Sequence, residues 1–199
     1  MKYTFLLLTA LLASSCSQTP GDAFRRSNDD STAAKMYHTM AQQGDVQAAF
    51  KLGLLLSERR LSPAEASHYG PASRWFAQSC PALPAACHNL GVEYTNAGDH
   101  QRAEQFYLTA ATRNYMQSQF NLASAYVNGY LPLPADPSQA FAWLLIARQE
   151  AARCQEAAPS LCQWVLTDKA GNQAWFRSRL TPAQQAEAER RAATWAARH

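Results

Sequence analysis

One short sequence box recurs four times along this chain: an alanine, two variable residues, an aromatic residue and a large residue. The four copies are Ala34-Lys35-Met36-Tyr37-His38, Ala72-Ser73-Arg74-Trp75-Phe76, Ala103-Glu104-Gln105-Phe106-Tyr107 and Ala140-Phe141-Ala142-Trp143-Leu144. Their first residues lie 38, 31 and 37 positions apart. A period in this range is typical of stacked helix pairs, in which each unit buries its apolar face only against its neighbours. The box therefore predicts a repetitive helical architecture.

A second motif follows each of the first three boxes at a nearly constant distance. It consists of a leucine and a small residue: Leu52-Gly53, Leu90-Gly91 and Leu122-Ala123. Each leucine lies 18 or 19 residues after the alanine that opens its box. Small residues let neighbouring helices approach closely, while large residues fill the grooves between them. Because no stretch shows a persistent strand-like alternation, we predict an all-α fold, a short α-solenoid of stacked antiparallel helix pairs.

The chain is predicted to have four parts. Residues 1–15 form a signal peptide, and residues 16–31 are polar and turn-rich, as expected of a flexible tether. Residues 32–178 hold the helical repeats, of which the last is degenerate, and residues 179–199 form a C-terminal capping helix. This last helix is predicted to begin at Thr181 and to have a mostly polar face, as expected where a solenoid ends.

The N-terminus resembles a bacterial lipoprotein signal. Lys2 precedes an apolar run over residues 5–12, which is too short to span a bilayer as a stable anchor. Small residues then lead to Cys16, which the resemblance implies is lipidated. The alternative is an ordinary secretory leader that is cut near Ser15 and leaves Cys16 as a free thiol. Ser17 resembles a signal for passage to the outer membrane, so we expect an anchor in its inner leaflet, facing the periplasm.

The other cysteines are even in number, as expected in an oxidising compartment. They form two closely spaced pairs, Cys80 with Cys87 and Cys154 with Cys162. Three connectivities are possible, and the short spacings favour the two local pairs. Metal ligation is disfavoured, because neither pair has the gap of a zinc knuckle and no histidine cluster accompanies them. We therefore expect two disulfides, no metal site and no cofactor.

Charge and motifs argue against nucleic-acid binding and against catalysis. The 18 basic and 15 acidic residues are interspersed, without the basic stripe of a nucleic-acid-binding protein. The five histidines lack metal-ligand spacing, and the chain has neither a phosphate-binding loop nor a nucleophile elbow. One set of box aromatics is the candidate binding face: Tyr37, Trp75, Tyr107 and Trp143. At this spacing such rings are more often packed between helices, and both interpretations stay open.

Together these motifs resemble the Sel1-like repeat proteins, relatives of the tetratricopeptide arrays. The residues that carry the resemblance are Ala72-x-x-Trp75-Phe76, Ala86-Cys87-His88-Asn89-Leu90-Gly91-x-x-Tyr94, Ala103-x-x-Phe106-Tyr107 and Asn121-Leu122-Ala123-x-x-Tyr126. The resemblance implies that the box helices supply a face for a protein partner. In a cysteine-rich branch of the family one disulfide joins the two helices of a repeat, and Cys80 and Cys87 occupy those places.

The predicted function is an envelope-anchored module for protein–protein interaction or a scaffold in the periplasm, without enzymatic activity. Its expected partners are an unidentified protein and, through the N-terminal lipid, a membrane. An immunity protein for a secreted effector is one specific use that the resemblance implies. The alternative is a cell-wall-active enzyme or a penicillin-binding, β-lactamase-like protein of the cysteine-rich branch, although the chain lacks the Ser-x-x-Lys box of such enzymes.

Overall fold

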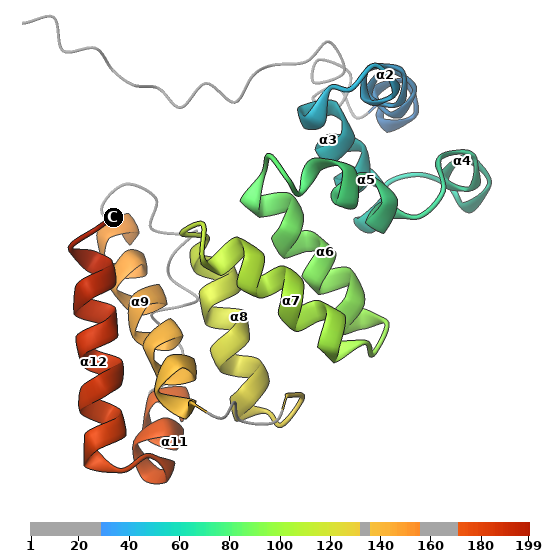
Figure 1. Ribbon diagram of the computed structural model, residues 1–199. Coiled ribbons are helices and arrows are strands. Elements are labelled where there is room, and N and C mark those ends of the chain that lie inside the picture. Colours follow the sequence, from blue (N-terminus) through green and yellow to red (C-terminus); the bar gives the residue numbers. More distant parts are fainter. Residues whose placement is uncertain (1–28, 132–135, 156–170) are drawn as a thin grey trace, which may run out of the picture.

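The computed structural model describes residues 29–131, 136–155 and 171–199. The first half holds five helices in Figure 1: α2 (Asp30–Gln42), α3 (Val46–Ser57), α4 (Pro63–Tyr69), α5 (Ala72–Ser79) and α6 (Pro84–Asn96). The second half holds α7 (His100–Ala111), α8 (Met116–Val127), α9 (Pro137–Gln155), α11 (Gly171–Arg179) and α12 (Pro182–Ala196). Strands are absent from these ranges, which confirms the all-α prediction.

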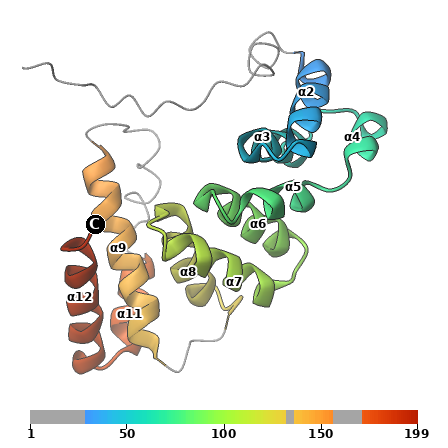
Figure 2. The same ribbon diagram turned by 45° about the horizontal axis from the view of Figure 1, so that its top comes forward.

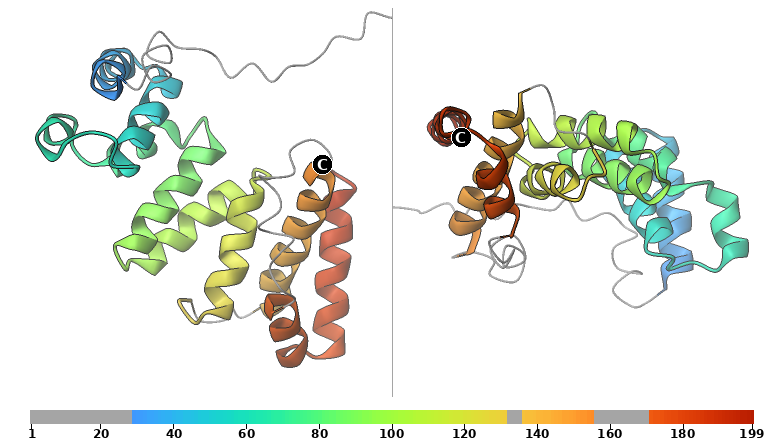
Figure 3. Two further views of the ribbon diagram at one scale, coloured as in Figure 1. Left: turned by 180° about the vertical axis from the view of Figure 1, so that it is seen from behind. Right: turned by 90° about the horizontal axis from the view of Figure 1, so that it is seen from below.

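The main helices pack against their neighbours in chain order, from α2 through α3, α5, α6, α7 and α8 to α9. The short helix α4 lies to the side of this stack (Figures 1 and 2). At the far end α12 packs against α9, as Figure 3 shows from behind. Helices that pack mainly against their neighbours along the chain define a solenoid, so the predicted α-solenoid is confirmed. Within the described ranges, no helix is both long and apolar enough to cross a membrane.

Two Gly-Asp turns separate successive helices in the same way. Gly44 and Gly98 have φ angles of 94° and 77°, a left-handed conformation that glycine adopts without steric penalty. The next residue then caps the following helix, because its carboxylate accepts backbone N–H groups that have no partner within the helix. Asp45 caps α3 and Asp99 caps α7 in this way. Each Gly-Asp pair therefore ends one helix and starts the next.

The glycine of the Leu-Gly motif packs against the last residue of the next box. A Cβ atom added at Gly53 would lie 2.7 Å from the Phe76 ring, and one at Gly91 would lie 2.7 Å from the Tyr107 ring. Both rings are buried and have little room to move. The side chain at these two motif positions must therefore be hydrogen.

In the following repeat, both the motif glycine and the ring at the end of the next box are replaced by other residues. Ala123 replaces the glycine, and Leu144 replaces the ring at the end of the box. Both residues are buried in one cluster of the core. The small residue of the motif thus faces the last residue of the next box at the interfaces α3–α5 and α6–α7.

Several boundaries differ from the sequence prediction. Helix α2 begins at Asp30, so the predicted tether, 16–31, extends too far; Asp29 caps this helix by accepting from the Thr32 N–H. The last part of the predicted degenerate repeat forms helix α11, which begins at Gly171. Helix α4 lies outside the predicted elements, although Ser62 and Glu65 form a capping box at its start. The predicted signal peptide, residues 1–15, lies outside the described residues.

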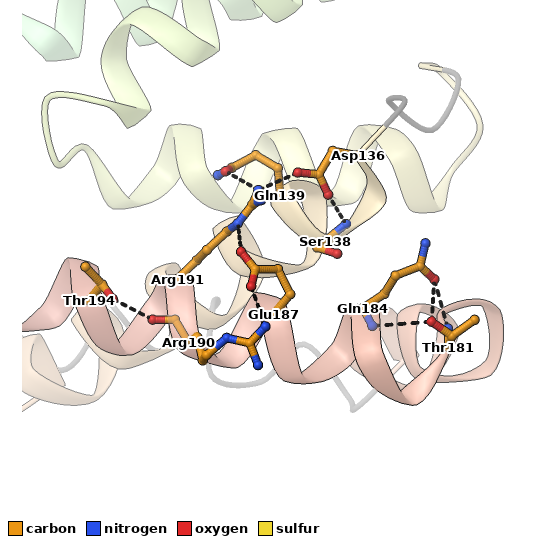
Figure 4. Close-up of polar contacts among 9 residues, drawn as sticks. All are labelled: Asp136, Ser138, Gln139, Thr181, Gln184, Glu187, Arg190, Arg191 and Thr194. Carbon is orange, nitrogen blue, oxygen red and sulfur yellow. Dashed lines mark hydrogen bonds and ion pairs between the residues drawn. The ribbon is translucent and has the colours of Figure 1, made fainter.

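The C-terminal helix closes the array through a polar network and a small-residue face. Arg191 lies 2.6 Å from the Asp136 carboxylate at the start of α9 and 2.7 Å from Glu187 on its own helix (Figure 4). Ala188 and Ala192 are buried in the core that α12 shares with α9. The predicted capping helix is therefore present, with its charged side chains attaching it to the preceding repeat.

Candidate functional site

The four aromatic residues that the sequence offered as a candidate binding face lie in the hydrophobic core. The exposed fractions of Tyr37, Trp75, Tyr107 and Trp143 are 0%, 1%, 5% and 5%. Large rings contribute most when they are removed from water, and the stacked helices bury them at every repeat. These residues therefore pack between helices, the other interpretation that the sequence left open. Tyr107 also lines a surface pocket.

That pocket lies among α6, α7, α8 and the turn that follows α8, and its volume is about 190 Å³. Its lining residues come from all four segments: Thr95, His100, Ala103, Glu104, Tyr107, Asn121, Ser124, Ala125, Asn128, Tyr130 and Leu131. Pockets for drug-sized ligands occupy about 300–1,000 Å³, so this one has the size for a single side chain or a similarly small group.

Hydrogen bonds hold the polar walls of the pocket in place. The Tyr126 hydroxyl donates to Glu104 Oε1 across 2.6 Å and so joins α8 to α7. Burial, followed by the adjacent Glu104 carboxylate, raises the pKa of Tyr126, so the phenol stays protonated and keeps donating. On the opposite wall the hydroxyl oxygens of Thr95 and Tyr107 lie 3.1 Å apart. The pocket is therefore built from side chains that are fixed before any ligand arrives.

An exposed aromatic ring stands at the rim. Tyr130 is 55% exposed, and it is the one large hydrophobic residue so exposed among those that the structure describes. Its ring stacks on His100, with ring centroids 5.2 Å apart and an interplanar angle of 16°. Exposed rings beside a pocket are common anchors in protein interfaces.

The sequence carries one local signal for this pocket that is independent of the repeat motifs. Asn121, Ser124, Ala125 and Asn128 are spaced i, i+3, i+4 and i+7, which places the first three on one face of α8 and the last at its C-cap. Small and polar residues on one face between two apolar stripes indicate a surface that neighbouring helices leave uncovered. The contributions of Glu104 and Tyr130 depend on contacts between helices and have no such local signal.

A serine–histidine pair lies close to the pocket but does not form a reactive site. His88 Nδ1 is 2.9 Å from Ser118 Oγ, a distance at which a base can activate a nucleophile. However, Ser118 is 0% exposed and offers no access to a substrate. Burial lowers the pKa of His88 to about 4, which makes the ring a weak base. His88 instead packs against Tyr107 and Tyr115, so the pair is a satisfied part of the core.

One predicted disulfide is present. Cys80 and Cys87 are bonded, with a Cα–Cα distance of 4.5 Å, and they join the end of α5 to the start of α6. Arg113 from the next repeat donates to the backbone oxygens of Cys80 and Ala82 across 2.9 and 2.8 Å. The cross-linked loop is therefore also attached to the following turn.

The remaining predicted cysteine sites fall outside what the structure describes. Cys16 and Cys162 lie outside the described residues, as does the side chain of Cys154, so the lipid attachment and the second disulfide stay predictions. Among the residues that are described, no group of three or more potential metal ligands occurs.

Comparison with known families identifies the repeats. A family model described as Sel1 repeat matches residues 17–45, 84–115 and 117–150. The second match covers α6 and α7, and the third covers α8 and most of α9. Each of these two repeats therefore begins with the Leu-Gly or Leu-Ala helix and ends with a box helix, and the pocket lies where they meet. A comparison with curated proteins gives no match.

Proposed function

Because the chain belongs to the Sel1-like repeat family, whose repeats are generally non-catalytic modules for protein–protein interaction, we propose that it is a lipid-anchored interaction module of a bacterial envelope. The observation that carries the proposal is the junction of two matched repeats, where a preformed pocket lies beside the exposed ring of Tyr130. A partner segment that binds there would bury this ring and fill the pocket.

The proposed compartment has two supports. The leader ends at Cys16 in a pattern that resembles a lipoprotein signal. In addition, disulfides persist in oxidising spaces such as the periplasm, and Cys80 and Cys87 form one. We propose that the repeats face the periplasm from the inner leaflet of the outer membrane.

Two uses of such a module are proposed, and affinity distinguishes them. An immunity protein must hold its effector tightly, with a Kd of about 1 nM or below, which corresponds to roughly −12 kcal/mol. A scaffold exchanges its partners and works with Kd values of about 1 μM, or roughly −8 kcal/mol. The Kd of the partner, once captured, therefore decides between neutralising a secreted effector and scaffolding.

Capture from envelope extracts tests the module. We expect the tagged full-length chain, solubilised from its own envelope, to retain a defined protein, because the repeats provide the binding surface. The matched control carries residues 1–31 in front of an unrelated folded domain, and it should retain nothing specific. Mass spectrometry of both eluates makes the comparison. Equal recovery of the same protein by the control would remove the repeats from the interaction.

A lipid-labelling experiment tests the anchor. We expect a palmitate analogue to label the wild-type chain and to leave Cys16→Ser unlabelled, because the lipid is attached through this thiol. Ser17→Ala is the matched control, since it changes the neighbouring residue and keeps the thiol, and it should be labelled like the wild type. Gel fluorescence after metabolic labelling gives the readout. A wild-type chain without label would instead support an ordinary cleaved leader.

A further inference from the structure

We propose that the pocket between α6, α7 and α8 binds a lysine side chain of the partner protein, with Glu104 as the counter-ion and Tyr130 against the aliphatic stem. The proposal rests on the proposed function as an interaction module, and it names the chemistry of the group that this module recognises.

A hydrogen bond that joins two helices in the preceding repeat is absent at the equivalent place in the pocket. In that preceding repeat, Ser57 on α3 donates to the Glu93 carboxylate on α6 across 2.6 Å. Ser57 and Thr95 both lie five residues after their motif leucines, while Glu93 and Ala125 both lie three residues after theirs. The pair that corresponds to Ser57 and Glu93 is therefore Thr95 and Ala125, and the alanine methyl group does not reach across.

The charge of the pocket favours a cation. Glu104 is its one acidic lining residue, and no ion pair involves Glu104 among the described residues. The lining also holds His100 and side chains without formal charge, among them Asn121 and Ser124; the Ser124 hydroxyl oxygen accepts a hydrogen bond from Asn172 of α11. An ammonium group carries three donors and no acceptor, so it matches a carboxylate with neutral acceptors around it.

The geometry at Glu104 favours lysine over arginine. A guanidinium binds a carboxylate best through two parallel hydrogen bonds, and this arrangement requires that both carboxylate oxygens are available as acceptors. Oε1 of Glu104 already accepts from the Tyr126 hydroxyl. One accessible oxygen suits the compact ammonium group of lysine, whose donors rotate to meet it.

The exposed ring at the rim matches the rest of a lysine side chain. A lysine buries its methylene stem along apolar surface while its charged end reaches a polar partner. Tyr130 and Leu131 provide apolar surface in the lining, and an aromatic ring also attracts a nearby cation through its face. The pocket volume of about 190 Å³ and this apolar surface together suit one long cationic side chain.

Titration with a defined peptide tests the proposal. The probe is acetyl-Gly-Lys-Gly-amide, and the control peptide replaces lysine with the uncharged norleucine. We expect the lysine peptide to cause saturable amide shifts at Glu104, Ala125 and Tyr130 in NMR spectra of the detergent-solubilised full-length chain. The norleucine peptide should bind about tenfold more weakly, because it lacks the charge-assisted hydrogen bond. Equal affinity of the two peptides would overturn the proposal.

Two variants locate the binding. Glu104→Gln removes the charge and keeps an acceptor for Tyr126, so we expect it to fold normally and to bind the lysine peptide about tenfold more weakly. Ala125→Glu restores the side chain found at Glu93, and we expect it to close the pocket and abolish the shifts. The matched control is Ala193→Glu on the exposed face of α12, which should bind like the wild type. Unchanged binding in Glu104→Gln would contradict the assignment even if Ala125→Glu failed to fold.

The outcomes separate this proposal from the proposed function. If the lysine peptide binds in the pocket while the full-length chain captures no protein, the lysine site stands and the interaction module fails. If wild type and Ala125→Glu capture the same protein equally well, the module stands and the lysine site is wrong.

Discussion

Replacing Trp75 with alanine is expected to lower the free energy of unfolding by about 3–5 kcal/mol, the range for removing a large buried ring. Trp75 is 1% exposed and lies in the N-terminal cluster with residues of α2 and α3. Its Nε1–H donates to the Tyr69 backbone oxygen across 2.9 Å in a buried position. Alanine would leave both a cavity and an unpaired carbonyl oxygen, and these two losses add.

Urea unfolding followed by far-ultraviolet circular dichroism measures the effect, through a lower midpoint at an unchanged m-value. Tyr130→Ala is the matched control, since it removes an aromatic ring that is 55% exposed, and it should change stability by no more than about 0.5 kcal/mol. A Trp75→Ala midpoint equal to that of Tyr130→Ala would show that the box ring is not a core residue.

The helical architecture could be predicted from the sequence because the motif residues recur at regular spacings along the chain. The box alanine, the motif leucine and the small residue after it recur at nearly constant separations, and each takes part in contacts between successive helices. Gly53 against Phe76, and Gly91 against Tyr107, show that the motif glycines and the ends of the boxes meet between successive helices. In a solenoid almost all contacts are of this kind, so a periodic sequence determines most of the fold.

The same periodicity misplaced the candidate site. A recurring aromatic residue shows that every repeat treats the position alike, and burial is what all repeats share. The pocket instead depends on a difference between repeats, namely Ala125 in the place of Glu93. It also depends on the bond from Tyr126 to Glu104, which lie on different helices. Such features follow from the fold and are found only once the helices are placed.

Helix α4 shows a second limit of prediction from repeat spacing. Helix α4 has a proline at its first turn and a capping box of Ser62 and Glu65, which are local signals for a helix start. It lies outside the stack, so it has no counterpart in the repeat that would draw attention to it. Local capping signals therefore deserve the same weight as repeat spacing where an insertion interrupts the array.

Loss of the Cys80–Cys87 disulfide is expected to lower the free energy of unfolding by about 2–3 kcal/mol, the value that chain-entropy arguments give for a short loop. The two cysteines are separated by 7 positions and lie in a buried cluster with Ala86 and Ala110. The change is Cys80→Ala with Cys87→Ala, because alanine leaves no free thiol and buries no polar group.

The double variant Cys80→Ala with Cys87→Ala is compared with a protein that keeps these two cysteines. Both carry Cys154→Ala and Cys162→Ala, so that only the Cys80–Cys87 bond differs between them. Urea unfolding with and without dithiothreitol then gives the contribution of the bond. Reductant should lower the midpoint of the protein that keeps Cys80 and Cys87 to that of the double variant, and it should leave the variant unchanged. Because the same bond closes the turn that Arg113 contacts from the next repeat, its loss should also weaken the coupling between the two halves of the array. An equal midpoint for both oxidised proteins would mean that packing alone holds this turn.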